Sequence, residues 1–200
     1  MDSTKQTVAA FDFDGTFIRA DSMTPYLRLF YSRREMFRIG RSVLPYLVGY
    51  QLGRVPRRQA KEFLLTQFLG GKTVEELEQK AQILADTVLP SRIRPKALEK
   101  LRWHQEQGHR CVLVTASLTL WTKAFAHKYG LDLVATLPEV IDGKFTGRLQ
   151  GTNNYGPEKV RRLEALIPPE TIEFLYAYGD TSGDRELLAR ADEGLYRPFH

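Results

Sequence analysis

The spacing of apolar residues changes along the chain and divides it into regions of different secondary structure. An almost uninterrupted apolar run covers residues 8–13 and ends near Gly15, which predicts a short buried strand. From about residue 22 to residue 89, apolar residues recur every three or four positions, as expected for helices with one buried face. Breaks near Gly53 and at residues 70–71 separate three or four helices. A block of helices is therefore predicted to follow the first strand.

The last helix of this block has the most regular pattern. Its apolar positions alternate between steps of three and four and define one face, formed by Val74, Leu77, Ala81, Leu84 and Val88. Thr73 and Glu76 have the spacing of a capping box, and Pro90 ends the pattern. These signals predict one amphipathic helix over residues 73–89.

After residue 95 the pattern alternates between helices and strands. Helical patterns cover residues 95–108, 118–130, 156–168 and 182–191, and strand patterns cover residues 109–117, 131–136, 172–180 and 193–199. Residues 139–149 have the pattern of a hairpin that turns at Asp142–Gly143. Alternating strands and helices favour a parallel sheet with helices on both faces. We therefore predict a Rossmann-like α/β core formed by residues 1–20 and 91–200, with residues 21–90 inserted as an all-helical cap.

Basic residues concentrate in the predicted cap. Between Arg28 and Lys61 the chain carries nine Lys or Arg and one acid, Glu35, so this segment has a formal charge of +8 within a total of +5. The arginines alternate with aromatic residues, a pattern that is typical of helices lying on an anionic membrane. The segment is therefore interpreted either as a surface for membrane or lipid-phosphate recognition or as an ordinary solvated face. Burial of the aromatics in the core of the cap would weaken the membrane interpretation.

Other features of the sequence favour a cytoplasmic protein. The first residues lack a basic region followed by an apolar stretch, so no signal peptide is predicted. The longest uncharged stretch between Arg41 and Arg54 has 12 residues, fewer than the ~20 that a membrane-spanning helix needs. The single cysteine, Cys111, excludes an intrachain disulfide and is expected to be an inert core residue. A cytoplasmic location is expected, with peripheral membrane contact through the basic cap as an addition.

Polar side chains follow several predicted strands, where parallel sheets form their ligand sites. Those expected to meet at this edge, one of them at a helix start, are Asp12, Asp14, Thr115, Ser117, Lys159, Asp180 and Asp184. Carboxylate oxygens favour Mg²⁺ over zinc, and the four histidines have no metal-ligand spacing and are expected at the surface or at helix ends. A carboxylate can attack phosphorus while a second one transfers protons, so one of the paired aspartates is predicted to be a nucleophile and the other an acid–base. Lys159, Thr115 and backbone N–H groups of the nearby loop would share the phosphoryl charge, whereas Ser117 is expected to cap the helix that follows it.

The segments "DFDGT" (residues 12–16), "VLVTAS" (residues 112–117) and "GDTSGD" (residues 179–184), with Lys159 between the last two, closely resemble the four ordered motifs of the haloacid dehalogenase-like hydrolases. The resemblance implies Asp12 as the nucleophile and Asp14 as the general acid–base. It also implies phosphate binding by Thr115, the backbone at Ala116 and Lys159. Mg²⁺ would be held by Asp12, the Asp14 carbonyl and Asp180, with Asp184 in support. An aspartate at position 14 favours a phosphatase over a dehalogenase.

The helical insertion resembles the cap of the phosphoserine phosphatase-like branch of this family, subfamily IB. Asp21 falls where phosphoserine phosphatases carry a glutamate that holds the substrate amine, so it would either bind substrate or fix the hinge into the cap. The sequence departs from phosphoserine phosphatases at Gly183, where they carry asparagine, and it does not identify the arginine that would hold the substrate carboxylate. The segments "DGKFTGRL" and "YGDTSGDRELL" and the run over residues 159–163 resemble bacterial subfamily IB hydrolases that include phosphatidylglycerophosphatase C.

Three functions follow from these observations. The resemblance implies a Mg²⁺-dependent phosphomonoester hydrolase that acts on a phospholipid headgroup phosphate such as phosphatidylglycerophosphate. The alternative substrate is a small soluble metabolite such as phosphoserine. A function of another class is a non-catalytic module that binds membrane or nucleic acid through the basic cap, although no nucleic-acid reader motif accompanies the charge and no nucleic acid is expected.

Overall fold

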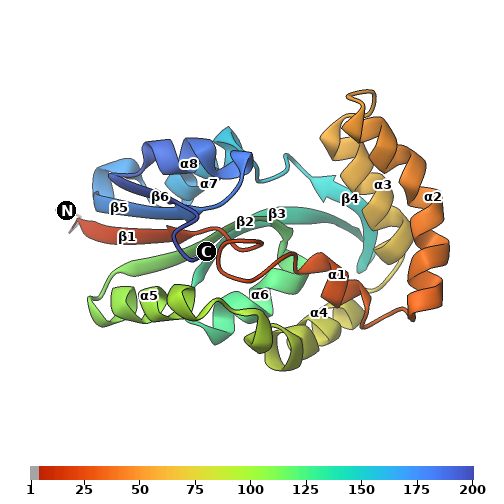
Figure 1. The fold of residues 1–200 in the computed structure, drawn as a ribbon, viewed down its shortest axis with the longest axis horizontal. Helices are drawn as coiled ribbons and strands as arrows, with labels where there is room; N and C mark the ends of the chain where they lie inside the picture. The colour runs from red at the N-terminus through yellow and green to blue at the C-terminus, as the bar shows by residue number, and fades with distance from the viewer. Residues whose placement is uncertain (1–4) are drawn as a thin grey trace.

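The computed structural model describes residues 5–200 and places six strands in one sheet (Figure 1). The strands, in chain order, are β1 (Gln6–Phe11), β2 (Arg110–Leu118), β3 (Asp132–Ile141), β4 (Lys144–Gln150), β5 (Ile172–Gly179) and β6 (Glu193–Tyr196). Their order across the sheet is β4-β3-β2-β1-β5-β6, and only the β3–β4 pair is antiparallel. The predicted parallel sheet is therefore confirmed for the described residues. The first four residues of the predicted core lie outside them.

Helices cover both faces of the sheet (Figure 1). Those after the cap are α5 (Pro95–Glu106), α6 (Thr119–Lys128), α7 (Pro157–Leu166) and α8 (Arg185–Arg190). Alternate residues of β1 point to two separate hydrophobic clusters, with Ala9 and Phe11 in one and Val8 and Ala10 in the other. All four are completely buried, because a central parallel strand is covered on both sides. The uninterrupted apolar run at the start of the sequence reflects this double burial.

The segment between β1 and β2 begins with four helices, which confirms the predicted helical insertion. They are α1 (Met23–Leu27), α2 (Arg33–Gln51), α3 (Arg57–Leu69) and α4 (Val74–Ile83). Leu77, Ala81 and Leu84 of the predicted face are buried, but the helix turns into a π-helical segment at Leu84–Val88. The predicted capping box at Thr73 forms only in part. The backbone N–H of Glu76 donates to the Thr73 hydroxyl, whereas the Glu76 carboxylate is paired with Lys72.

The β3–β4 hairpin packs against α3 of the cap. It turns at Asp142 and Gly143, which both have positive φ, as predicted for this dipeptide. Arg58 of α3 donates a hydrogen bond of 3.2 Å to the Leu149 carbonyl, and the Leu149 N–H donates one of 3.0 Å to the Glu62 carboxylate. The hairpin therefore gives α3 a fixed support beside the carboxyl ends of the central strands. The division of the chain at residues 20/21 and 90/91 stays a prediction.

Among the described residues, no helix combines the length and the apolar character that a bilayer-spanning segment requires. The longest helix, α2, has 19 residues, and its mean hydropathy is lowered by several arginines.

Candidate active site

Three buried carboxylates meet where β1 and β5 end. Asp12 follows β1, and Asp180 and Asp184 follow β5, and all three are less than 10% exposed. One carboxylate oxygen from each lies within 4.8 Å of the other two. Thr16 donates a hydrogen bond of 2.9 Å to Asp180, which fixes the orientation of that carboxylate. The structure thus brings together three of the four predicted metal ligands through their side chains.

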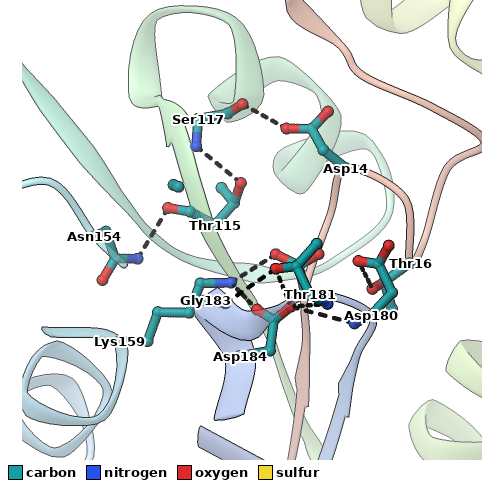
Figure 2. A network of polar contacts seen from close by, with 12 residues as sticks. Asp14, Thr16, Thr115, Ser117, Asn154, Lys159, Asp180, Thr181, Gly183 and Asp184 are labelled. Carbon is teal, nitrogen blue, oxygen red and sulfur yellow. Dashed lines mark hydrogen bonds and ion pairs between the residues drawn. The ribbon is translucent and has the colours of Figure 1, made fainter. Parts of the chain in front are cut away.

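Lys159, in the first turn of α7, is buried among these carboxylates. Its Nζ donates hydrogen bonds to Asp12 Oδ1 at 2.6 Å and to Asp184 Oδ1 at 2.5 Å. Figure 2 shows the lysine pointing toward Asp184 from the side opposite Asp180. Burial alone would lower the pKa of Lys159, but the two adjacent carboxylates raise it above its usual value. The lysine is therefore held in its charged form.

Burial also affects the pKa values of the neighbouring carboxylates. Burial raises the pKa of Asp12 to about 7, although Lys159 works in the opposite direction. For Asp184, burial is outweighed by Lys159 and by hydrogen bonds from Thr181, so the pKa of Asp184 is lowered. Asp184 Oδ2 also accepts the backbone N–H of Asp180 at 3.2 Å. Asp184 consequently holds both the lysine and the loop that carries Asp180.

The donor set of this cluster fits Mg²⁺. Three carboxyl groups share a buried site with a single lysine, and a bound cation would favour their ionised forms. Every candidate ligand atom is a hard carboxylate oxygen, which Mg²⁺ prefers. Asp12, Asp180 and Asp184 are the residues that could hold the ion.

Asp14 lies two residues beyond Asp12 but is directed elsewhere. Its Oδ1 accepts the backbone N–H of Ser22 at 2.5 Å. Its Oδ2 accepts the Ser117 hydroxyl, also at 2.5 Å (Figure 2). Burial raises the pKa of the Asp14 carboxyl. The prediction that Ser117 caps the next helix is wrong, because Leu118 occupies the N-cap of α6 and no side chain caps that helix. The Ser117 hydroxyl instead orients Asp14.

The predicted phosphate-binding loop after β2 is fixed by buried polar side chains. Asn154 donates to the Thr115 carbonyl at 2.9 Å, and Thr136 donates to the Ala116 carbonyl at 2.8 Å. Thr115 itself is 1% exposed, and its hydroxyl accepts the backbone N–H of Ser117 (Figure 2). These bonds fix the loop beside a small cavity, described below, that Thr115 and Ala116 help to line. Sequence reasoning missed both Asn154 and Thr136.

Lys61 connects the cap to this loop. From α3 its Nζ donates to the Ala116 carbonyl and to Asn153 Oδ1, both at 2.6 Å. Burial, with a smaller contribution from Arg57, lowers the pKa of Lys61 to about 8. The sequence analysis counted Lys61 in the basic segment but assigned it no role. Its contacts span more than fifty residues of chain, and no local pattern indicates them.

Two adjoining cavities meet at Asp14. A small cavity of about 140 Å³ is lined by Asp12, Thr115, Lys159 and Asp184, and its volume suits a phosphoryl group. A larger cavity of about 310 Å³ lies between the cap and the core. Its apolar walls are Met23, Leu47, Tyr50, Leu64 and Trp121. Asp14, Arg57 and Ala116 line both cavities.

Arg57 supplies a cation from the cap at this boundary. Its guanidinium lies 3.7 Å from the centroid of the Tyr155 ring, and both residues line the smaller cavity. Stacking on an aromatic face restrains a guanidinium while leaving its N–H groups free to bind an anion. Arg57 is thus a cap arginine placed beside both cavities, a position that the sequence did not indicate.

The sequence leaves two roles open for Asp21, which are substrate binding and fixing the hinge into the cap. Its carboxylate accepts the backbone N–H of Thr24 at 2.6 Å, which holds the first turn of α1. Asp21 also lines the larger cavity. Its position is compatible both with a hinge and with substrate contact.

Three further expectations concern aromatic, histidine and cysteine side chains. The aromatics of the basic segment divide, because Phe30 and Tyr31 are partly buried against the main hydrophobic cluster whereas Phe37 is 70% exposed. His104 lies in the last turn of α5, as the expected helix-end location allows, but it is completely buried and hydrogen-bonded at 2.8 Å to both His109 and Tyr178. Cys111 is buried, and its burial raises the pKa of the thiol to about 12, as expected for an inert core residue.

Comparison with known proteins identifies the family. The family model described as haloacid dehalogenase-like hydrolase matches residues 9–189. The chain belongs to the haloacid dehalogenase-like hydrolases. The match covers the four motifs that carry the buried carboxylates, the loop after β2 and Lys159, so the predicted family is confirmed.

Relatives and solved structures agree with this assignment. The chain is 39% identical over 194 residues to Protein CicA of Caulobacter vibrioides, covering 96% of this chain and 86% of that one. A structure from Bordetella pertussis, of unknown function, superimposes with a TM-score of 0.81 at 27% identity, covering 94% of this chain and 88% of that one. A phosphoserine phosphatase, solved as a phosphoaspartyl intermediate analogue, has a TM-score of 0.66 at 21% identity, covering 96% of this chain and 86% of that one. The last likeness confirms the α/β fold class, and together the comparisons support a phosphatase of this hydrolase family.

Proposed function

We propose that this protein is a Mg²⁺-dependent phosphomonoesterase that transfers the phosphoryl group of its substrate to Asp12. The observation that carries the proposal is the arrangement of two aspartates around two adjoining cavities. Asp12 lines only the small cavity, where the phosphoryl group would bind, whereas Asp14 lies between that cavity and the larger one. The two carboxylates therefore face different atoms of a bound ester.

In the first step a carboxylate oxygen of Asp12 attacks phosphorus and the bond from phosphorus to the ester oxygen breaks. The carboxyl group of Asp14 donates its proton to the departing oxygen at the boundary of the cavities. Lys159 and the backbone N–H groups of the loop at Thr115 and Ala116 stabilise the negative charge of the phosphoryl oxygens. Lys159 already binds Asp12 Oδ1, so it also fixes the orientation of the nucleophile.

In the second step the Asp14 carboxylate takes a proton from water while the water oxygen attacks phosphorus. The bond from phosphorus to Asp12 breaks, which releases inorganic phosphate and restores both carboxyl groups to their starting states. The hydrogen bonds from Ser22 and Ser117 keep Asp14 in one orientation through both proton transfers. When bound by Asp12, Asp180 and Asp184, Mg²⁺ would supply charge compensation for the phosphoryl transfer.

The larger cavity supports a substrate with a partly apolar body and a second anionic group. Its walls are mainly apolar, and Arg57 at its entrance is suited to an anion. A phospholipid headgroup phosphate, such as that of phosphatidylglycerophosphate, combines these features. Phosphoserine is the second candidate because Asp21 and Arg57 line the same cavity and could bind its amine and carboxylate.

The decisive experiment measures phosphate release with Mg²⁺ from phosphatidylglycerophosphate in mixed micelles, from phosphoserine and from p-nitrophenyl phosphate. Asp12→Asn should abolish release from all three, whereas the exposed hairpin variant Asp142→Asn should match the wild type. Full activity of Asp12→Asn would overturn the nucleophile assignment, and no release from any substrate by the wild type would overturn the phosphatase. A preference for phosphoserine that Asp21→Asn removes would favour the second candidate over the lipid.

A further inference from the structure

The cations of the cap face in two directions, and most of them do not face the cavities. Arg57 and Lys61 line the larger cavity, but the basic residues of α2 and of the turn after it do not. The outward-facing group is exposed and consists of Arg33, Arg34, Arg38, Arg41 and Arg54. Among residues 5–200, Arg58 is the only basic residue between positions 28 and 61 that forms an ion pair. The charge of the outward-facing group is therefore not neutralised within the described chain.

An apolar stripe runs along α2 beside these arginines. Phe37, Leu44, Val48 and Leu52 follow one another at steps of seven, four and four, which places them on one side of a helix. They are 70%, 56%, 47% and 61% exposed. Four large apolar side chains with this exposure on a single helix form an apolar surface patch of the kind that marks an interaction site.

The opposite side of α2 already has its partner within the chain. Val43 is buried, and Met36 and Ile39 are partly buried against the main hydrophobic cluster. Leu47 and Tyr50 form one wall of the larger cavity. The stripe is thus a second apolar face of α2. The helix lies at one end of the molecule, and no other helix or strand of the described chain covers its outer side (Figure 1).

We propose that this outward face of α2, formed by the apolar stripe and the flanking arginines, binds an anionic lipid bilayer. Exposed apolar side chains flanked by arginines are the combination that an interfacial helix needs, because the rings and aliphatic groups enter the acyl boundary while the guanidinium groups remain among anionic headgroups. Binding in this way brings the wall of the larger cavity next to the lipid surface.

The combination of charge and apolar side chains favours a bilayer over two other partners, a second copy of this chain and a nucleic acid. A symmetric contact with a second copy would place the same arginines against each other, which is repulsive. A nucleic acid would neutralise the arginines but would leave the apolar stripe in contact with water. Glu35, the only acid between positions 28 and 61, offsets a single charge, and its carboxylate is held at the N-cap of α2 by the Ser32 backbone N–H and hydroxyl.

The test is co-sedimentation of the full chain with vesicles of phosphatidylcholine alone and of phosphatidylcholine mixed with phosphatidylglycerol. Binding is expected only to the mixed vesicles and should weaken at high salt. Two double variants separate the contributions, Arg34→Gln with Arg41→Gln for charge and Phe37→Ser with Leu44→Ser for the stripe. Each should reduce the partition coefficient on the order of tenfold or more.

The matched control is Lys96→Gln with Arg102→Gln on α5, which removes the same charge from exposed positions toward the other end of the molecule (Figure 1). It should bind like the wild type, and all variants should keep the circular dichroism spectrum of the wild type, which shows that they are folded. Absence of binding to mixed vesicles, or an equal loss in the control, would overturn the proposal. A dimer in sedimentation velocity that disappears in Phe37→Ser with Leu44→Ser would also overturn it and assign the face to a second copy. Because vesicle binding is read without turnover, failure of the proposed phosphatase would leave this result interpretable.

Discussion

Replacing Arg57 by methionine tests the role of the cap in catalysis. Arg57 is placed on α3 and lines both cavities, but its contact with the core is a stack on Tyr155 rather than an ion pair. The substitution keeps the aliphatic length of the side chain and removes the charge. Because Asp12, Lys159 and Asp184 of the small cavity are left unchanged and Arg57 forms no ion pair within residues 5–200, the effect should appear in catalysis and not in folding.

The expected magnitude follows from the hydrogen bonds that would be lost. A hydrogen bond from a charged donor contributes about 1.5–3 kcal/mol, which corresponds to a decrease in kcat/KM of about 10- to 150-fold. Arg57→Lys keeps the charge but not the planar group that stacks on Tyr155, so its loss should be smaller. Tyr155→Leu removes the stack together with the 2.8 Å hydrogen bond between the Tyr155 and Ser182 hydroxyls, and loss of the stack should cost about 0.5–1 kcal/mol in the same quantity.

The assay is steady-state kinetics on p-nitrophenyl phosphate, whose single anionic group would bind in the small cavity that Arg57 also lines. This soluble substrate avoids any effect of membrane binding. Arg54→Met, in the turn just before α3, removes an equal charge from a position that lines neither cavity and is the control. It should stay within about twofold of the wild type. An Arg57→Met enzyme with a kcat/KM as high as that of Arg54→Met would refute the assignment of Arg57 to substrate binding.

Three further predictions concern the core. Gly15→Ala should abolish Mg²⁺-dependent activity without unfolding the protein, as checked by turnover and circular dichroism, because Gly15 has positive φ and a Cβ there would collide with the Asp180 carboxylate. Ser117→Ala should lower kcat by about tenfold with little change in KM, measured on the same substrate, because the hydroxyl that orients Asp14 is lost. Burial lowers the pKa of His104 to about 4, so the unfolded state takes up its proton first as the pH falls below about 6.5. The free energy of unfolding should therefore drop by up to about 3 kcal/mol between pH 6.5 and pH 4, and urea titrations of His104→Gln should lack this part of the decrease.

The position of Asp12 and Asp180 could be predicted from sequence because each one follows a strand of the parallel sheet. Strand ends converge at one edge whatever the exact packing of the helices, whereas Lys159, at the start of α7, was placed there by the motifs that resemble the family. The β1 pattern was equally informative, since a strand buried on both faces has no polar alternation to confuse it with a surface element.

Side-chain directions and contacts between the cap and the core could not be predicted in the same way. Ser117 has the residue type of a helix cap, yet its hydroxyl turns to Asp14 across more than a hundred residues of chain. Lys61 and Arg57 look like members of a basic run, and only the packing of α3 against the β3–β4 hairpin directs them toward the cavities. The burial of His104 could not be predicted, because one polar residue in the last turn of a helix gives no sign of the tyrosine and histidine that satisfy it in the interior.

The division of charge between the cap and the core connects the site with the surface of α2. The core gathers buried carboxylates with a single lysine, so its charge can be balanced by a metal ion. The cap directs Arg57 and Lys61 toward the cavities, where we propose that Arg57 receives an anionic group of the substrate. Five others of the nine basic residues line neither cavity and lie on the outward side of α2 or in the turn after it, beside an exposed apolar stripe. Attraction of substrate alone would not need that stripe, whereas a phosphatase that takes its substrate from an anionic bilayer would need both the charge and the apolar side chains.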